Sequence, residues 1–252
     1  PQVVARRQRE RARRPARTTS TMRIRIVQHS AADRPAAAAD VIDRLGHFAE
    51  TTRIDRGDAL PTTVDADVLM MFGGGISLAS GELPPWVAQE QKLIRSYVNE
   101  GRRVIGICLG SQMIAAALGA RVRRNDHCEV GWHEIERAED SVSPNIADEI
   151  PNRLIVLQWH QDTFDLPPGA TRLFRSAACD NQAFEIDNRV FGFQFHFEAN
   201  PKTVTTFLAV SNKWKQHGQF VQSESEISSG IETHLPAQTE SLNRFLDAYL
   251  VD

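Results

Sequence analysis

A single cysteine stands where an apolar run changes into a helix-like segment. Cys108 lies in VIGICLGSQM (residues 104–113), between Gly106 and Gly110. A thiol on a sharp turn from a buried strand into a helix projects outward, and the helix N-terminus stabilises negative charge on the sulfur. The flanking glycines relieve the crowding that such a turn creates. The pattern therefore predicts a cysteine nucleophile; the alternative is that Cys108 is a small buried hydrophobic residue.

A histidine and a glutamate after another apolar run are suited to activate that thiol. In GFQFHFEAN (residues 192–200), alternation places Gln194 and His196 on one side of an expected strand, near its carboxyl end. Glu198 follows two residues later, so its carboxylate can bond the second imidazole nitrogen and orient the ring. A lone histidine here would more often be structural, but the His-x-Glu pair in a chain with a cysteine elbow predicts a base and its orienting acid.

Three consecutive glycines follow a third apolar run, in MFGGGIS. A loop made of Gly73, Gly74 and Gly75 can turn a backbone N–H toward a developing oxyanion, beside the N–H of Leu109. Glycine loops also bind phosphate, but the loop has neither the G-x-G-x-x-G spacing nor the lysine of a P-loop. We therefore interpret it as an oxyanion loop.

Short apolar runs alternate with segments of helical periodicity after Met22, and these elements must position the three motifs. We expect strands over residues 24–27, 67–72, 104–107, 154–157 and 190–195. We expect helices over roughly residues 35–49 and from Pro84-Pro85 to a stop at Gly101. The alternation predicts an α/β fold, a doubly wound and mostly parallel sheet with helices on both faces. Such a sheet binds ligands at the carboxyl ends of its strands, where Cys108 is expected.

The sequence changes character beyond Pro201. A helix is expected to continue there, and residues 215–236 are polar and predict a loop or weak helix. Residues 239–250 predict a helix capped by Thr239, with an apolar stripe made of Leu242, Phe245, Leu246, Tyr249 and Leu250. We interpret residues 202–252 as a helical extension docked on the domain of residues 22–252; a helix that forms a homodimer is the alternative.

The composition limits the classes of partner. The 252 residues are 41% hydrophobic and 24% charged with a formal net charge of −3, which gives no reason to expect nucleic acid. No apolar run approaches the roughly 20 residues that span a bilayer. Three cysteines are a sparse, odd set that favours the reducing cytoplasm over a disulfide framework, and no spacing typical of a metal site is visible.

Residues 5–21 (ARRQRERARRPARTTST) differ from the rest, with seven arginines and one acidic residue. A segment with almost nothing apolar cannot contribute to a core. We expect residues 1–21 to be a basic, disordered extension ahead of a natural start at Met22. An organelle-targeting arm is the alternative, although no apolar helical face is present.

The segments GICLGSQ, FGGG and FQFHFE together resemble the class I, triad-type glutamine amidotransferases, over residues from about 22 to 201. The segment LQWHQDTFDLPPGATRL further resembles the stand-alone, GMP-synthase-like branch, whose members include γ-glutamyl peptidases. The resemblance implies a flavodoxin-like sheet and hydrolysis of a γ-glutamyl amide through a thioester. It implies no metal and no other cofactor.

The resemblance also implies a role for individual residues. Cys108 matches the nucleophile, and His196 and Glu198 match its base and the orienting acid. Gly74 and Leu109 match the oxyanion donors. The positions implied for the substrate pocket are Gln112, Gly73, His160, Gln161, Asp162, Gly131 and Trp132.

Three positions depart from the family pattern. Phe197 replaces the proline usual between the histidine and the glutamate, which is expected to loosen that turn. Gly75 stands where the oxyanion loop usually has proline, so less pre-organisation of the loop is expected. Gln161 replaces a common glycine, which affects the contact to the substrate α-carboxylate. None of the three removes a reacting group.

The expected function is therefore hydrolysis of the γ-amide of glutamine, or of a γ-glutamyl compound, with release of ammonia for amide transfer. The residues after about 201 are too few for a synthetase domain, so the ammonia would go to a separate synthase subunit. One alternative is a stand-alone γ-glutamyl peptidase or transferase. Others are a non-catalytic protein that binds γ-glutamyl ligands or a partner, and the cysteine-elbow peptidases and chaperones that share this type of sheet.

Overall fold

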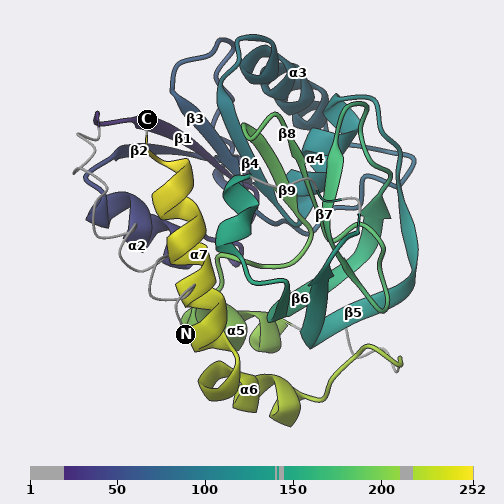
Figure 1. Cartoon of the computed structure of the whole chain (residues 1–252). Helices are drawn as coiled ribbons and strands as arrows, with labels where there is room; N and C mark the ends of the chain where they lie inside the picture. The colour runs from purple at the N-terminus through teal and green to yellow at the C-terminus, as the bar shows by residue number, and fades with distance from the viewer. Residues whose placement is uncertain (1–19, 140, 142–144, 211–217, 252) are drawn as a thin grey trace.

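A mixed sheet of nine strands forms the centre of the protein (Figure 1). The computed structural model describes residues 20–139, 141, 145–210 and 218–251. The strands in these ranges are β1 (Arg23–Gln28), β2 (Phe48–Arg53), β3 (Val68–Met71), β4 (Arg103–Ile107), β5 (Val122–Arg137), β6 (Arg153–Phe164), β7 (Thr171–Ser176), β8 (Ala183–Ile186) and β9 (Val190–Phe193). Their order in space is β2-β1-β3-β4-β9-β8-β7-β5-β6. The first five have the order 2-1-3-4-5 of flavodoxin-like sheets.

Half of the sheet differs from the prediction. Strands β2, β1, β3, β4 and β9 pair in parallel, but β9-β8, β8-β7, β7-β5 and β5-β6 are antiparallel, so the expectation of a mostly parallel sheet was wrong. The reason lies in the segments that connect consecutive strands. A parallel pair needs a long crossover that is usually helical, and the described residues contain no α-helix between Ala117 and Pro201. The β8-β9 turn at Asp187 and Asn188, both with φ above +50°, is of the hairpin type.

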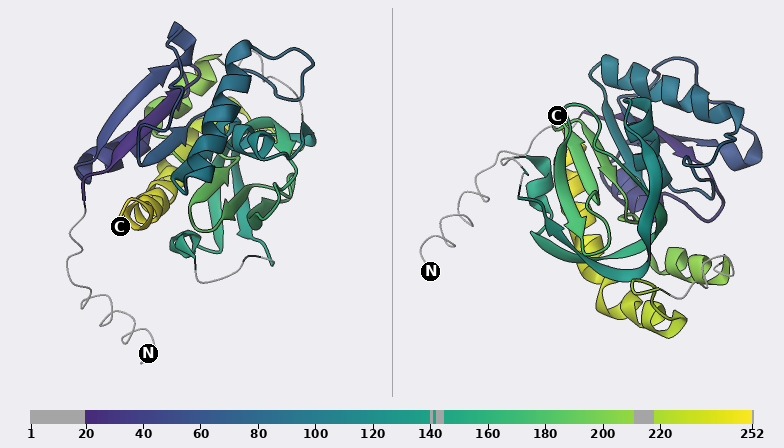
Figure 2. Two further views of the ribbon diagram at one scale, coloured as in Figure 1. Left: turned by 90° about the horizontal axis from the view of Figure 1, so that it is seen from above. Right: turned by 90° about the vertical axis from the view of Figure 1, so that its right-hand side faces the viewer.

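Helices cover both faces of the sheet, as the strand–helix alternation predicts (Figure 2). The described helices are α2 (Ala36–Arg44), α3 (Pro85–Asn99), α4 (Leu109–Ala117), α5 (Pro201–Val210), α6 (Glu224–Thr233) and α7 (Leu235–Tyr249), with short 3₁₀ turns η1 (Ile54–Arg56) and η2 (Ile146–Glu149). Apolar residues of α2 and α7 share one core cluster with the sheet, and apolar residues of α3 and α4 share a second cluster with it. A third cluster joins β5 and β6 to α5 and α6.

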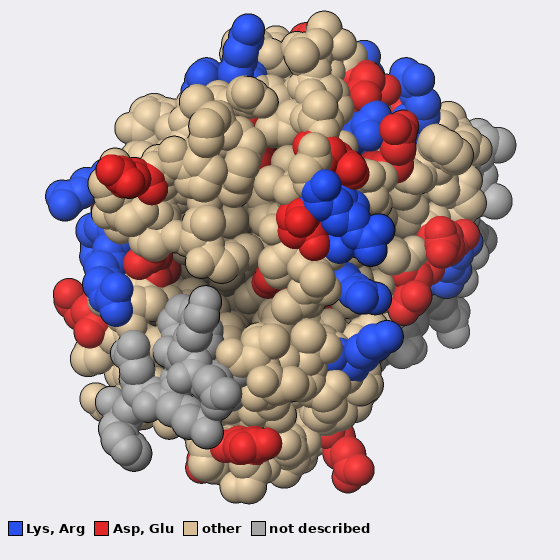
Figure 3. Space-filling model, turned by 180° about the vertical axis from the view of Figure 1, so that it is seen from behind, with Lys and Arg blue, Asp and Glu red and all other residues tan. Residues whose placement is uncertain are grey.

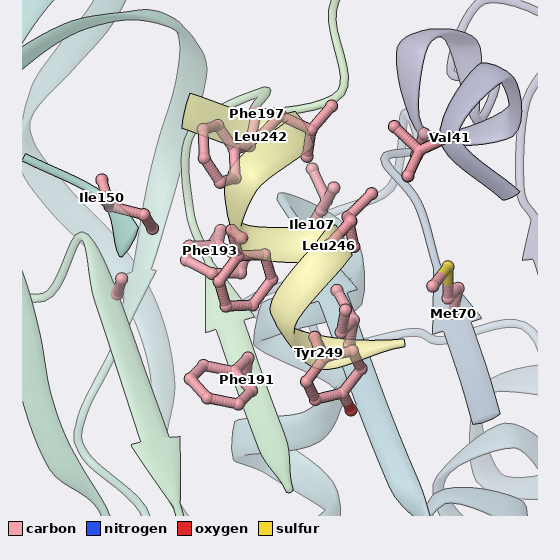
Figure 4. Close-up of a cluster of buried hydrophobic side chains, with 14 of the residues drawn as sticks. Val41, Met70, Ile107, Ile150, Phe191, Phe193, Phe197, Leu242, Leu246 and Tyr249 are labelled. Carbon is pink, nitrogen blue, oxygen red and sulfur yellow. The ribbon is translucent and has the colours of Figure 1, made fainter. Parts of the chain in front are cut away.

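The C-terminal helix is part of the main core. Leu242, Leu246 and Tyr249 of α7 pack with Phe191 and Phe193 of β9, and all five side chains are buried (Figure 4). The ring of Phe191 meets that of Tyr249 edge to face, with centroids 5.4 Å apart. The apolar stripe expected over residues 239–250 is therefore the face that docks on the sheet.

Several element boundaries differ from those expected. The helix expected over residues 35–49 ends at Arg44, and Phe48 already belongs to β2. The strand expected over residues 190–195 ends at Phe193. Helix α7 begins at Leu235, so Thr239 lies inside it and is no cap. Part of the polar stretch forms α6, whose N-cap Ser223 makes a capping box with Glu226.

Some expectations concern residues that lie outside the described ranges. The basic extension expected over residues 1–21 is one, apart from Ser20 and Thr21. Within the described ranges, no helix has the length and apolar character needed to cross a membrane.

Gly106 and Gly110 allow the close approach of β4, α4 and β3. A Cβ on Gly106 would overlap the backbone of Gly110 and Ser111, and one on Gly110 would overlap the carbonyl group of Met71. Because the obstructing atoms are backbone, rotation of a side chain cannot relieve the overlap. The sequence-based interpretation of the two glycines is thus supported by the packing.

We predict that Gly106→Ala and Gly110→Ala each lower the free energy of unfolding by about 2 kcal/mol or more, as overpacking of a tight core does. Urea denaturation followed by circular dichroism measures the change. Gly81→Ala is the matched control, since a Cβ at Gly81 meets no atom within 4 Å. Equal stability of Gly110→Ala and Gly81→Ala would contradict the packing argument.

Candidate active site

Cys108 occupies a strained turn between β4 and α4. Its backbone has φ +52° and ψ −109°, in the left-handed region that a residue with a Cβ rarely adopts. The Cys108 N–H donates to the Phe193 carbonyl over 2.8 Å, and the Ser111 hydroxyl donates to the Cys108 carbonyl over 2.7 Å. These bonds tie the elbow to the end of β9 and to the first turn of α4.

His196 lies close enough to Cys108 for the two groups to interact electrostatically, on a turn rather than on the expected strand. On the other side of the ring, His196 Nδ1 is 3.0 Å from Glu198 Oε1. Both side chains are buried, and the ring of Phe207 in α5 covers the imidazole with centroids 4.7 Å apart. Burial by itself lowers the pKa of His196, but the charges of Glu198 and Cys108 outweigh it and raise that pKa well above its ordinary value.

A glutamine on α7 fixes this turn. Gln238 is fully buried, and its Nε2 donates to the carbonyl oxygens of His196 over 2.9 Å and of Phe197 over 3.3 Å. Its Oε1 accepts the N–H of Leu157 over 2.8 Å. Phe197 itself is buried in the core. Where the family pattern has a proline, the turn is thus held by a side-chain amide and a core aromatic residue.

A pocket of about 230 Å³ opens beside the sulfur. Its walls are Gly74, Gly75, Ile76, Ser77, Cys108, Leu109, Gln112, Arg124, Trp159, His160, Gln161 and Asp162. Seven of the twelve residues predicted for the site therefore line one cavity: Gly74, Cys108, Leu109, Gln112, His160, Gln161 and Asp162. The volume suits a small amino-acid amide.

The two oxyanion candidates are neighbours in the pocket wall. A Cβ on Gly74 would come within 2.6 Å of Leu109 Cδ2 and 2.9 Å of His29 Cβ, so glycine lets the loop pack closely against both residues. Gly73 does not line the pocket. It lies between Asp33 and His196, and a Cβ there would overlap the Asp33 carboxylate and stand 3.0 Å from His196 Cε1. Gly73 thus brings the glycine loop against the histidine.

Hydrogen bonds hold the part of the pocket wall that contains Gln112, His160 and Asp162. Gln112 Nε2 donates to the Gln194 Oε1 over 3.1 Å and, at 3.4 Å, to the Asp162 carbonyl oxygen, which also lies 3.0 Å from His160 Nδ1. On its other side, His160 Nε2 stands 3.0 Å from the fully buried Glu129. Burial alone raises the pKa of Glu129, but His160 outweighs it and the net effect is a lowered pKa.

The structure does not bring Gly131 and Trp132 to the pocket. Gly131, with φ +108°, packs against Gln222. Trp132 donates its indole N–H to the Ile227 carbonyl over 2.8 Å, and its ring lies against Gly230. These two residues dock α6 on β5, so the segment that resembles the family serves packing here.

Several residues in or beside the pocket were not predicted. Gln194 donates to Cys108 Sγ at 3.8 Å, and its only signal in the sequence is its placement on the same side as His196. Ser77 donates a hydrogen bond to the Asp162 carboxylate and comes two residues after the glycine loop. Arg124 comes from β5, a strand that was not predicted, and pairs in register with Asp162 of β6. Nothing in the local sequence marks it.

The other two cysteines are not comparable with Cys108. Burial raises the pKa of Cys128 and of Cys179 to about 11, so both remain thiols at neutral pH. Cys179 contacts the hydroxyl of Thr163 at 3.1 Å, away from the pocket. Among the residues with described positions, no group of three or more His, Cys, Asp or Glu side chains is placed to hold a metal ion.

We predict that Glu198→Gln lowers the pKa of His196, because the carboxylate charge that favours the imidazolium is lost while the side-chain shape is kept. An NMR titration of the His196 ring resonances measures the shift. Glu134→Gln, a change at a half-exposed surface carboxylate, serves as the control. If His196 titrates at the same pH in the wild type and in Glu198→Gln, the carboxylate does not act on the ring as its geometry indicates.

Comparisons with known proteins show the family to which the chain is similar. The family described as glutamine amidotransferase class I matches residues 39–213. Over 233 residues the chain is 33% identical to the glutamine amidotransferase-like protein YfeJ of Salmonella typhimurium, a match that covers 90% of this chain and 96% of that protein. The crystal structure of a glutamine amido transferase from Methylobacillus flagellatus superposes with a TM-score of 0.80 at 31% identity, over 91% of this chain and 96% of that one.

Two further relatives match a smaller part of the chain. One component of the glutamine-hydrolyzing GMP synthase of Pyrococcus abyssi is 32% identical over 139 residues, 54% of this chain and 72% of that component. Gamma-glutamyl peptidase 5 of Arabidopsis thaliana is 27% identical over 164 residues, 64% of this chain and 60% of that protein. The family predicted from the three motifs is confirmed: the chain belongs to the class I glutamine amidotransferases.

Proposed function

We propose that this protein hydrolyses the γ-amide of glutamine through a thioester on Cys108 and releases ammonia. The observation that carries the proposal is Cys108 in the wall of a pocket that suits an amino-acid amide, with His196 interacting with the thiol and Glu198 bonded to His196. A thiol, a base on one side of it and a carboxylate behind that base are the parts that acyl transfer requires. Membership of the family supports the same chemistry.

The reaction proceeds in two halves. The Cys108 thiolate attacks the amide carbon, and the N–H groups of Gly74 and Leu109 stabilise the oxyanion of the tetrahedral intermediate. The His196 imidazolium gives its proton to the amide nitrogen, the carbon–nitrogen bond breaks and ammonia leaves. In the second half, His196 takes a proton from water and the hydroxide attacks the thioester carbon. The carbon–sulfur bond then breaks and glutamate leaves, which restores the Cys108 thiolate and the His196 imidazolium.

Two charges at the far end of the pocket suit the amino-acid end of the substrate. Arg124 offers a guanidinium for the α-carboxylate, and the carboxylate of Asp162, oriented by Ser77, suits the α-ammonium group. Gln112 lines the same pocket and is bonded to the backbone of Asp162. Because Arg124 supplies a charged contact, the glycine that Gln161 replaces is not needed to bind the α-carboxylate.

The fate of the ammonia separates two versions of the function. The relative that is one component of a GMP synthase suggests a separate synthase subunit that takes up the ammonia. The relative named gamma-glutamyl peptidase suggests instead that a γ-glutamyl peptide is the substrate and that an amine leaves in place of ammonia. Both use the same thioester, so they differ in the leaving group and not in the residues that act. A homodimer through the C-terminal region stays an expectation.

The free thiols and the surface charges bear on the cellular compartment and on the kind of partner. Cys108, Cys128 and Cys179 are all free, which fits the reducing cytoplasm. Basic and acidic side chains are interspersed on the face in Figure 3, so that face has no basic stripe of the kind that follows a nucleic-acid backbone. We accordingly propose a cytoplasmic enzyme whose partners are small γ-glutamyl molecules.

We predict that Cys108→Ala abolishes ammonia release from glutamine while the protein stays folded, because the small change removes only the nucleophile. A coupled assay for ammonia and glutamate measures the loss, and the same assay with a γ-glutamyl peptide tells the two versions apart. Cys128→Ala, at a half-buried thiol outside the pocket, should keep full activity. Turnover retained by Cys108→Ala would end the proposal.

We predict that Arg124→Gln raises the KM for glutamine about tenfold and leaves kcat nearly unchanged, because the α-carboxylate is bound equally in the ground and transition states. Steady-state kinetics measures both constants. Arg123→Gln is the matched control, since the neighbouring Arg123 pairs with the exposed Asp165 at 3.3 Å. A loss of kcat without a change in KM would place Arg124 elsewhere in the reaction.

A further inference from the structure

A buried histidine–glutamate pair lies behind the glycine loop and is not part of the reacting groups. His29 directly follows β1, and Glu90 is on α3, one turn after Trp86. The side chain of His29 is 2% exposed and that of Glu90 is fully buried. The ring of His29 stacks on that of Trp86 with centroids 5.3 Å apart. A fully buried carboxylate is costly unless it is paired, so the pair calls for an explanation.

Both nitrogens of the His29 ring face hydrogen-bond acceptors. Nδ1 is 2.9 Å from the Phe72 carbonyl oxygen and 3.3 Å from that of Gly73. Nε2 is 3.0 and 2.9 Å from the two carboxylate oxygens of Glu90. A proton is therefore required on each side of the ring. Burial alone lowers the pKa of His29, but the Glu90 carboxylate outweighs it and the net effect is a raised pKa.

The carbonyl groups that His29 binds belong to the oxyanion loop. The Gly73 carbonyl and the Gly74 N–H are the two ends of one peptide group, which is planar and trans, so they point in opposite directions. A donor that holds the Gly73 oxygen on the side of His29 therefore turns the Gly74 N–H the other way. His29 also packs directly under the loop, because a Cβ on Gly74 would stand 2.9 Å from His29 Cβ.

We propose that His29, held by Glu90, is a positioning residue for the oxyanion site. Its Nδ1–H binds the Phe72 and Gly73 carbonyl oxygens and fixes the peptide plane that presents the Gly74 N–H to the substrate oxygen. The inference rests on the proposed function. The contact from His29 gives the glycine loop the rigidity that a proline at position 75 would otherwise supply. The observation that supports this inference is the hydrogen bonding of His29 Nδ1 to the Phe72 and Gly73 carbonyl oxygens. Neither His29 nor Glu90 lines the substrate pocket.

The test removes the bond and keeps the packing. His29→Phe/Glu90→Leu retains an aromatic ring against Trp86 and leaves no unpaired buried charge, an exchange that proteins often tolerate. Glu90→Gln is the conservative variant, since a neutral His29 can still donate from Nδ1 while the glutamine amide donates to Nε2. We measure kcat and KM for glutamine, and the rate at which iodoacetamide alkylates Cys108. Alkylation passes through no oxyanion and reports the thiol alone.

The expected result is a kcat about 10- to 100-fold lower in the double variant, since loss of one oxyanion donor costs about 100- to 1,000-fold and a misplaced donor costs less. KM and the alkylation rate should change little, and Glu90→Gln should keep most of the wild-type kcat. A folded double variant with wild-type kcat overturns the inference. So does a parallel loss of turnover and alkylation, which indicates a general structural role.

A second pair of variants serves if the double variant does not fold. His29→Asn and His29→Leu, each with Glu90→Leu, differ in whether a side-chain amide can donate to the Phe72 carbonyl. A higher kcat for the asparagine form supports the inference, and equal kcat values overturn it. The wild-type protein distinguishes failure of this inference from failure of the proposed function. If the wild type releases neither ammonia nor an amine from any γ-glutamyl substrate, the proposed function and the inference are both overturned. If the wild type is active, the kcat values of the variants decide the inference alone.

Discussion

The site depends on the strained backbone of Cys108. With φ +52° and ψ −109°, this residue ends β4 and begins α4 in a conformation that costs about 1–3 kcal/mol and persists only where the surroundings enforce it. The enforcement comes from the packing of Gly106 and Gly110, and from the bond of the Cys108 N–H to Phe193. Cys108 and His196 are 88 residues apart along the chain. They meet because β4 and β9 are parallel neighbours, so the carboxyl ends of both strands lie at the same edge of the sheet.

Three buried His–Glu pairs lie in or near the candidate site in the described part of the chain, and each histidine contacts a group of that site. The pairs are His29–Glu90, His160–Glu129 and His196–Glu198. The first contacts the carbonyl groups of the glycine loop, the second contacts the Asp162 carbonyl on the wall that carries Gln112, and the third interacts with the thiol of Cys108. In a low-dielectric interior such pairs are rigid hydrogen-bonding groups, because leaving either partner unpaired would be costly. Preorganised donors of this kind are what transition-state stabilisation requires.

The residues that we propose to react could be picked out in the sequence because each lies in a short segment with its own signature. The cysteine between two glycines, the His-x-Glu and the glycine loop are each local patterns, and the parallel strands that carry them follow from their apolar runs. Antiparallel strands β5, β7 and β8 were missed, since their alternation is mixed with charged residues such as those of Val122–Arg137. Arg124 was missed along with its strand. The partners of His29 and of the His196 turn were missed because Glu90 and Gln238 are 61 and 42 residues away along the chain, on helices whose surface pattern gives no hint of them. Gly131 and Trp132 were misplaced because a family resemblance identifies a segment, not what packs against it.

If the proposed chemistry is right, the γ-glutamyl part of glutamine becomes covalently attached to one sulfur in the course of turnover. Rapid acid quench of the protein during glutamine hydrolysis, followed by mass spectrometry of its peptides, detects such an adduct. We expect a γ-glutamyl group on the peptide that contains Cys108 and none on those of Cys128 and Cys179. Glutamine turnover with no trapped adduct at any quench time, or with the adduct on another cysteine, would contradict the thioester mechanism.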